Sequence, residues 1–165
     1  GVAMASGMSG VSLGVEEAEE ALRPVCQRLA REIVRDGEGA TRLVAVRVRG
    51  ARDPEEALLA ARGVAESPLV KTAFFGRDPN WGRVVQALGA TIHDLDASGV
   101  KVVFGGLEVA GAGQPLEADE ASLKEIMSAE EVVLDVYLGR GNAEEEVLTC
   151  DLGYEYVRIN AEYHT

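Results

Sequence analysis

The sequence predicts an α+β protein on the basis of three observations. Apolar residues recur at three- and four-residue spacing from Val15 onward, which indicates a long amphipathic helix. The stretch "TRLVAVRVRG" (41–50) alternates apolar and charged residues, as a half-buried strand does. After Val100 the strand-like stretches are separated by short turns, which favours antiparallel pairing. We therefore expect helices and strands in one α+β fold, with antiparallel pairs dominant after Val100.

Two helices are predicted in the first third of the chain. Residues 1–14 are rich in small residues and are expected to be irregular. The helix from Val15 contains Pro24, which predicts a kink or a restart, and Gly37 is expected to end it. A second helix is predicted over 54–66, because a proline in its first turn is pre-set for helix.

The middle of the chain predicts a strand followed by a helix. "LVKTAFFG" (69–76) is interpreted as a strand. "DPNWGRVVQALG" (78–89) is interpreted as a helix with Asp78 as its N-cap, Pro79 at its first position and Gly89 at its end.

The second half predicts one further helix, Asp119–Met127, among several strands. The strand-like stretches are 100–106, 107–113, 131–139, 146–152 and 154–160. The first two of them are expected to form a hairpin. A domain boundary near residue 50 is predicted, which divides the chain into 1–50 and 51–165.

Composition excludes several classes of function. The net charge of −12 and pI near 4.6 argue against nucleic acid or an anionic membrane as a partner, because either one needs a basic surface. No stretch approaches the roughly 20 apolar residues of a membrane span. The cysteines and histidines (Cys26, Cys150, His93 and His164) form no metal motif, so we expect reduced thiols, surface histidines, no metal and a cytoplasmic protein. The chain starts at Gly1 without an initiator methionine and without a secretory signal, which suggests a processed or truncated polypeptide.

The stretch "GRDPNWGR" (76–83) has two interpretations. Arg77 and Arg83, beside glycines and a helix start, could bind an anion. Asp78 at the expected N-cap would repel a phosphate, and no phosphate-binding glycine motif is present. Trp81 shares helical spacing with apolar residues, so a packing role for it is favoured.

Polar candidates for a binding site lie in two other places. Glu38 stands between two glycines after a helix, where its carboxylate could bind a substrate ammonium or orient a proton; the alternative is a solvated turn residue. Asn160 and Thr165 supply hydrogen-bonding groups at the end of the chain, and Thr165 adds a terminal carboxylate; the alternative is a frayed terminus. These residues do not form a complete catalytic constellation.

Three long stretches, taken with their order, nevertheless resemble a known family. They are "REIVRDGEGATRLVAVRVRGA", "SPLVKTAFFGRDPNWGRVVQALG" and "CDLGYEYVRINAEYHT". From about Val15 to Thr165 the chain is similar to the β-chain of the glutamate N-acetyltransferase/ornithine acetyltransferase family of arginine biosynthesis.

The resemblance implies a self-cleaving precursor whose new N-terminal threonine carries acetyl from N-acetylornithine to glutamate. It implies an α-chain partner, an α2β2 assembly and no cofactor, with acetyl-CoA as a possible donor. Residues 1–50 would then end an αββα-type catalytic layer of the N-terminal-nucleophile kind. Residues 51–165 would form a small C-terminal α/β domain with mainly antiparallel strands.

The resemblance also implies that Glu38, Asn160 and Thr165 contact the substrate, while no catalytic residue lies in this chain. The cleavage motif, the threonine and the oxyanion-hole residues are absent, so the polypeptide alone is expected to be inactive. Gly153 and His164 are milder departures, since relatives usually carry Thr or Ser and Arg at these positions. The alternative function is a non-catalytic module that binds an amino acid or assembles with another chain.

Overall fold

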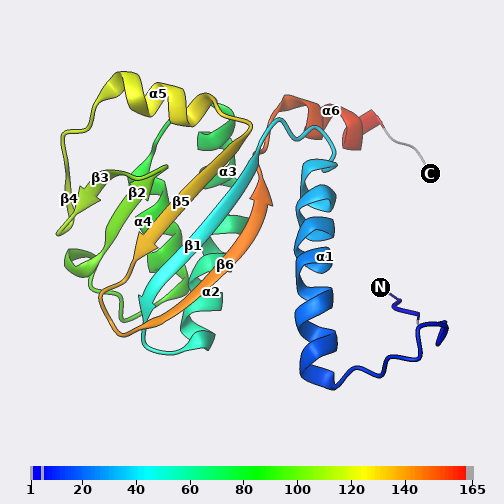
Figure 1. The fold of residues 1–165 in the computed structure, drawn as a ribbon. Coiled ribbons are helices and arrows are strands. Elements are labelled where there is room, and N and C mark those ends of the chain that lie inside the picture. Colours follow the sequence, from blue (N-terminus) through cyan, green and yellow to red (C-terminus); the bar gives the residue numbers. More distant parts are fainter. Residues whose placement is uncertain (1, 5, 163–165) are drawn as a thin grey trace.

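A six-stranded mixed sheet forms the centre of the fold (Figure 1). The computed structural model describes residues 2–4 and 6–162. The strands are β1 (Leu43–Ala51), β2 (Lys101–Phe104), β3 (Leu107–Gly111), β4 (Gln114–Pro115), β5 (Glu131–Tyr137) and β6 (Ala143–Cys150). They lie side by side in the order β4-β3-β2-β5-β1-β6. The β1–β5 pair is parallel and the other neighbouring pairs are antiparallel, which confirms the α+β class and the dominance of antiparallel pairing.

Helices cover one face of this sheet and lie along its margins (Figure 1). They are α1 (Val15–Arg35), α2 (Pro54–Glu66), α3 (Pro68–Phe75), α4 (Trp81–Thr91), α5 (Glu120–Ser128) and α6 (Tyr154–Glu162), with a short 3-10 turn at Ala97–Gly99. Figure 1 shows α2, α3 and α4 behind the sheet, α5 along its upper edge, and α1 standing beside the edge strand β6. None of these helices combines the length and the hydrophobicity that crossing a membrane requires.

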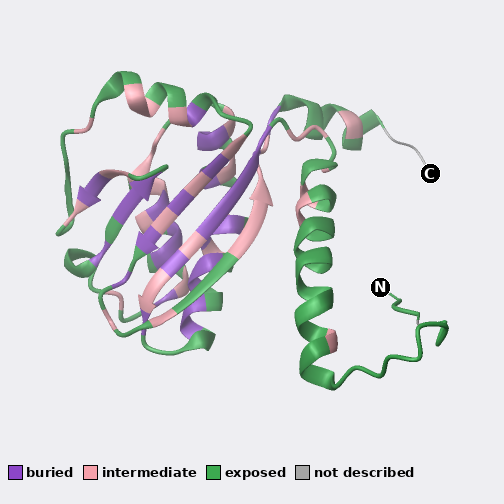
Figure 2. Cartoon of the chain, in the orientation of Figure 1, coloured by how far each residue is buried: buried purple, intermediate pink, exposed green. Residues whose placement is uncertain are grey.

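The alternation in β1 divides the two faces of the sheet. Val44, Val46 and Val48 are fully buried in the core between the sheet and its helices. Arg47 and Arg49 lie on the other face, where cross-strand partners on β6 are acidic: Arg47 opposes Glu146 and Arg49 opposes Glu144. Figure 2 shows the same division, with buried residues concentrated in β1, β2, β5 and the helices behind them, and with α1 almost wholly exposed.

Two stretches interpreted as strands are helices. Residues 69–75 belong to α3 and Gly76 is its C-cap, because Ser67 caps the start and because Val70, Ala73 and Phe74 are buried at three- and four-residue spacing rather than alternately. Residues 154–160 belong to α6, where Arg158 pairs with acidic side chains one turn before and one turn after it.

The predicted bounds of α4 are also wrong at both ends. Asn80, not Asp78, is the N-cap, and its side-chain oxygen accepts a hydrogen bond from the Arg83 amide at 3.1 Å. Asp78 instead accepts from the Asn80 side chain at 2.8 Å. Gly89 lies inside the helix, because the backbone pattern continues to Thr91.

Helix α1 continues through Pro24, so the predicted restart does not occur. Proline deprives the carbonyl four residues earlier of its helical partner, but this part of α1 is exposed and water can replace that hydrogen bond. The division of the chain near residue 50 stays a prediction. Strand β1, which ends there, lies in the interior of the sheet between β5 and β6.

Candidate active site

The loop between α1 and β1 carries Glu38 and is held tightly against the end of β6 and the start of α6. Gly39 has φ 71°, and a Cβ there would lie 2.5 Å from the backbone nitrogen of Tyr156. A Cβ on Gly37 would lie 3.3 Å from Sγ of Cys150. Only glycine permits the positive φ and the close approach at residue 39. Gly39 therefore lets the loop press against α6, and Gly37 lets it lie close to the end of β6.

Two of the three predicted substrate-binding residues meet at this loop. The Asn160 side-chain nitrogen donates a hydrogen bond to Oε2 of Glu38 at 2.9 Å and another to the carbonyl of Tyr156 at 2.9 Å. Both side chains are exposed to solvent. Thr165 and His164 lie outside the described residues. We call Glu38, Asn160 and the loop that carries Glu38 the Glu38 site.

The Glu38 site suits a cationic ligand. The amide of Asn160 orients the carboxylate, while Oε1 of Glu38 makes no hydrogen bond within residues 2–4 and 6–162. An exposed, oriented carboxylate with one uncommitted oxygen can accept a hydrogen bond from a substrate ammonium or amine.

Helix α3 contacts the start of α6 through one hydrogen bond and one aromatic pair. The Leu152 amide donates to the carbonyl of Lys71 at 3.2 Å. The Phe75 and Tyr154 rings meet edge to face, with centroids 5.5 Å apart. A Cβ on Gly153 would lie 2.4 Å from Cε2 of Phe75, so glycine at this position lets the Phe75 ring lie directly against the backbone.

A buried acid under the Glu38 site was not identified from the sequence. Asp151 is 2% exposed and accepts hydrogen bonds from the amides of Thr41 at 2.7 Å and Arg42 at 3.1 Å. Its position directly after the last residue of β6 was the available signal, since an acid that ends a strand often binds nearby backbone amides.

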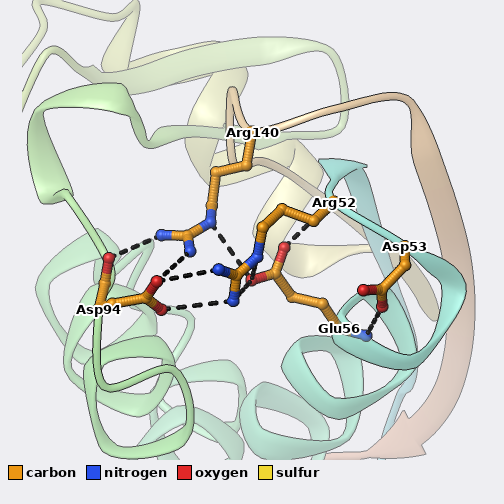
Figure 3. Close-up of polar contacts among 5 residues, drawn as sticks. All are labelled: Arg52, Asp53, Glu56, Asp94 and Arg140. Carbon is orange, nitrogen blue, oxygen red and sulfur yellow. Dashed lines mark hydrogen bonds and ion pairs between the residues drawn. The ribbon is translucent and has the colours of Figure 1, made fainter.

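A second polar cluster lies at the other end of β1 and is shown in Figure 3. Glu56 is 6% exposed and accepts hydrogen bonds from the Arg52 amide at 2.7 Å and from Arg52 Nε at 2.9 Å. Arg140 Nε lies 3.2 Å from Glu56, without the alignment of a hydrogen bond. Asp94 pairs with Arg52 at 3.0 Å and with Arg140 at 2.8 Å. We call Arg52, Asp53, Glu56, Asp94 and Arg140 the Arg52 network.

The two guanidiniums of the Arg52 network lie against the carboxylates of Glu56 and Asp94. The hydrogen bond from Arg140 lowers the pKa of Asp94 below its ordinary value, and Arg52 acts in the same direction. Asp53 does not bind a cation but caps α2, since its side chain accepts from the Glu56 amide at 2.8 Å. The network therefore ties α2 to the two loops that carry Asp94 and Arg140, and we assign it a structural role.

The stretch around Trp81 also has a structural role. Trp81 is half-buried and packs against the core, as the helical spacing predicted. The Arg83 guanidinium donates to the carbonyl of Leu69 at 2.9 Å and to the hydroxyl of Thr72 at 3.3 Å, so it fastens α4 to α3. Arg83 therefore does not point at a free helix N-terminus.

Comparison with known proteins identifies the family. The ArgJ family model matches residues 1–165. A glutamate N-acetyltransferase from Methanopyrus kandleri is 47% identical over 99% of this chain and 44% of its own length. The arginine biosynthesis bifunctional protein ArgJ from Deinococcus radiodurans is 47% identical over 98% of this chain and 41% of its own length. The chain thus spans less than half the length of these curated relatives.

A solved structure agrees with both the fold and the family. The crystal structure of arginine biosynthesis bifunctional protein ArgJ from Bacillus halodurans superimposes with a TM-score of 0.91 at 37% sequence identity. The match covers 98% of this chain and 79% of the crystallised one. By its sequence and its fold, the chain belongs to the ArgJ family.

Proposed function

We propose that this chain is the C-terminal part of the β-chain of an acetyltransferase that moves acetyl from N-acetylornithine to glutamate. The names of the related proteins support this reaction class. The observation that carries the proposal is the hydrogen bond of 2.9 Å between Glu38 and Asn160, which are 122 residues apart. The resemblance implies that both residues contact the substrate, and this hydrogen bond brings them to one place.

The proposed reaction has two acyl transfers. A threonine hydroxyl outside this chain attacks the acetyl carbonyl of N-acetylornithine; the bond from that carbon to the ornithine nitrogen breaks, and the nitrogen takes up a proton. The amine of glutamate then attacks the threonine ester, which releases the hydroxyl and forms N-acetylglutamate. Donors outside this chain stabilise the oxyanion of each tetrahedral intermediate.

In this scheme the present chain binds the amino-acid part of the substrate. Glu38 holds an ammonium group, Asn160 keeps the Glu38 carboxylate oriented, and Thr165 contributes a further hydrogen-bonding group. Acetyl-CoA is proposed as an alternative acetyl donor, with no other cofactor.

The exposed apolar face of α1 favours the binding of a partner chain there. Leu22, Val25, Leu29 and Ile33 form an apolar stripe along α1 and are 43% to 73% exposed. At about 100° per residue, the stripe lies roughly 140° around the helix from the mean direction of Gln27, Ala30, Arg31 and Val34, which line a cavity together with residues of β6. An apolar stripe this long is normally covered in a native assembly.

We propose that the part of the full-length protein missing from this chain, including the α-chain, covers the stripe in an α2β2 assembly. The last residue of the stripe, Ile33, lies five positions before Glu38. A partner that binds the stripe therefore lies next to the Glu38 site. In this arrangement α1 belongs to the proposed αββα catalytic layer, and the division into 1–50 and 51–165 remains part of the proposal.

The test compares the isolated chain with the full-length protein. With N-acetylornithine and glutamate, we expect transfer by the full-length protein and none by the isolated chain. Glu38→Gln should lower kcat/KM about 100-fold in the full-length protein, because the substrate ammonium loses its charged partner. Transfer by the isolated chain, or unchanged kinetics in Glu38→Gln, would contradict the proposal.

The exposed stripe on α1 also fits a non-catalytic assembly module. Calorimetry with ornithine, glutamate and arginine, together with the transfer assay, distinguishes the two functions. A module would show association or amino-acid binding without acetyl transfer by the full-length protein.

A further inference from the structure

Asp151 is a buried carboxylate that the proposed reaction does not use. It takes part in no ion pair among the residues that the structure describes, and the guanidinium of nearby Arg42 points elsewhere, toward the carbonyls of Phe74 and Met127. Removing a carboxylate from water costs several kcal/mol unless hydrogen bonds replace the lost solvation. The position of those hydrogen bonds therefore indicates what the buried acid does.

The three donors to Asp151 all come from Thr41 and Arg42, the last two residues of the loop that carries Glu38. Oδ1 accepts from the Thr41 amide at 2.7 Å and from the Arg42 amide at 3.1 Å, and Oδ2 accepts from the Thr41 hydroxyl at 2.5 Å. In return, the Asp151 amide donates to the carbonyl of Arg42 at 3.3 Å. One side chain thus joins residues 41 and 42 to the end of β6.

These contacts lie where the two strands separate. The β1–β6 ladder ends at the pair Leu43 and Cys150. Before Leu43 the chain turns toward the Glu38 loop, and after Cys150 it turns into α6, which carries Asn160. Beyond that pair one backbone hydrogen bond remains, from the Asp151 amide to the Arg42 carbonyl, and the Asp151 carboxylate adds contacts to residues 41 and 42.

We propose that Asp151 is a positioning residue that sets the relative placement of Glu38 and Asn160. The Glu38–Asn160 hydrogen bond spans the two segments that Asp151 joins, and both of its side chains are exposed. An exposed hydrogen bond contributes little stability and cannot hold two segments in place by itself. The contact of Gly39 with α6 limits how closely the loop approaches, and Asp151 prevents the segments from moving apart.

The structural part of this inference is independent of the proposed reaction and is tested on the 165-residue chain by NMR. The reporter is the side-chain amide of Asn160. In Asp151→Ala, we expect the chemical shift of this amide to move toward the value of an Asn side chain that makes no hydrogen bond within the protein. Its protons should exchange at least about 10-fold faster, while the amides of β1 and β5 keep their chemical shifts. In Asp151→Asn the signal should stay near that of the parent chain, because an amide oxygen can still accept from Thr41 and Arg42.

Asp119→Ala is the matched control. Asp119 also accepts a hydrogen bond from a backbone amide, that of Ser122 at 2.7 Å, but it does so at the start of α5. This variant should leave the Asn160 signal unchanged. An unchanged Asn160 signal in a folded Asp151→Ala chain overturns the inference.

Should Asp151→Ala fail to fold, Thr41→Val decides the question, because it deletes only the hydroxyl contact to Oδ2. A shifted Asn160 signal in this variant supports the positioning role, and an unchanged signal contradicts it.

The kinetic consequence rests on the proposed function and has its own test. In the full-length enzyme, Thr41→Val should raise KM about 3- to 10-fold, and this effect should shrink to less than about 2-fold when Glu38→Gln is already present. Equal effects in the two backgrounds would contradict an action through Glu38. If the enzyme transfers no acetyl, the proposed function fails, while the NMR result still decides the role of Asp151.

Discussion

The two ends of β1 carry polar clusters that differ in how far their charges are matched. At the end near Ala51, the Arg52 network joins carboxylates and guanidiniums from α2 and two loops. At the other end, roughly 30 Å away by strand length, Glu38 contacts one neutral amide and stays exposed. Both clusters are rich in hydrogen-bonding groups, but the Arg52 network places guanidiniums against Glu56 and Asp94, whereas Glu38 has no cationic partner among the described residues.

This difference shows how to separate a binding site from a structural network. A buried acid must be paired or hydrogen-bonded, because a buried charge without partners is strongly destabilising: Glu56 lies against two guanidiniums, and Asp151 accepts three hydrogen bonds. An exposed acid such as Glu38 is solvated without a partner, so nothing in the folding energy requires its orientation. The fact that Asn160 nevertheless orients Glu38, and that Asp151 fixes the segments carrying both, points to a ligand.

The largest expected effect separates the two ends by activity. In the full-length enzyme, Glu38→Ala should lower kcat/KM by about 100-fold or more, while Asp94→Asn in the Arg52 network should change it less than about 2-fold. Steady-state kinetics with N-acetylornithine and glutamate measure both. A comparable loss in the two variants would end the distinction between the clusters.

Folding stability, in contrast to activity, should depend strongly on the Arg52 network. Glu56→Ala leaves Arg140 and Arg52 without their buried partner, and it should cost about 2 kcal/mol, less than a fully buried pair because Arg52 is half-exposed. Urea unfolding measures this change. Glu55→Ala, in the same turn of α2 but exposed, is the control and should stay within about 0.5 kcal/mol. Equal losses in both variants would remove the network's structural role.

Two glycines with the same φ test how tightly each end is packed. Gly39 and Gly50 both have φ 71°, so alanine costs about 1 kcal/mol of backbone strain at either position. At Gly39 the added Cβ also meets backbone at 2.5 Å, whereas at Gly50 the nearest atom lies 3.3 Å away. Gly39→Ala should therefore be the more destabilising in thermal unfolding, and it should displace the Asn160 side-chain signal. A smaller effect at Gly39 would contradict the close packing of the loop on α6.

Acid should weaken the Arg52 network with the smallest effect of the four. The pKa of Asp94 is lowered in the folded protein, chiefly by the hydrogen bond from Arg140, so its contribution is present above its unfolded value near 3.8. That contribution is lost as the pH falls through the lowered folded value. In Asp94→Asn, stability measured by urea unfolding between pH 5 and pH 2 should fall less steeply with acid than in the parent chain. Identical slopes would show that Asp94 does not contribute to the loss of stability in acid.

Much of the architecture was predictable because local patterns carry it. The valines of β1 alternate, the hairpin of β2 and β3 has its short turn, and α2 has both its cap and its proline, so these elements are confirmed. Residues 69–76 and 154–160 were predicted wrongly, because short stretches rich in apolar and aromatic residues fit either element. Glu38 and Asn160 were singled out as polar candidates from their setting in the sequence, and the family resemblance implied that they contact the substrate; this binding role stays a prediction.

By itself, the sequence determined the α+β class, the buried face of β1 and the presence of polar candidates in the Glu38 loop and near the chain end. The tertiary structure decided which polar groups meet. Asn160 reaches Glu38, Asp151 reaches Thr41 and Arg140 reaches Glu56 across 84 to 122 residues of chain. The physical reason is that local spacing records which side of an element a residue occupies, whereas long-range partners depend on strand order and helix placement. In this protein, that placement leaves the Glu38 carboxylate exposed beside a neutral amide, while Glu56 and Asp94 lie against guanidiniums.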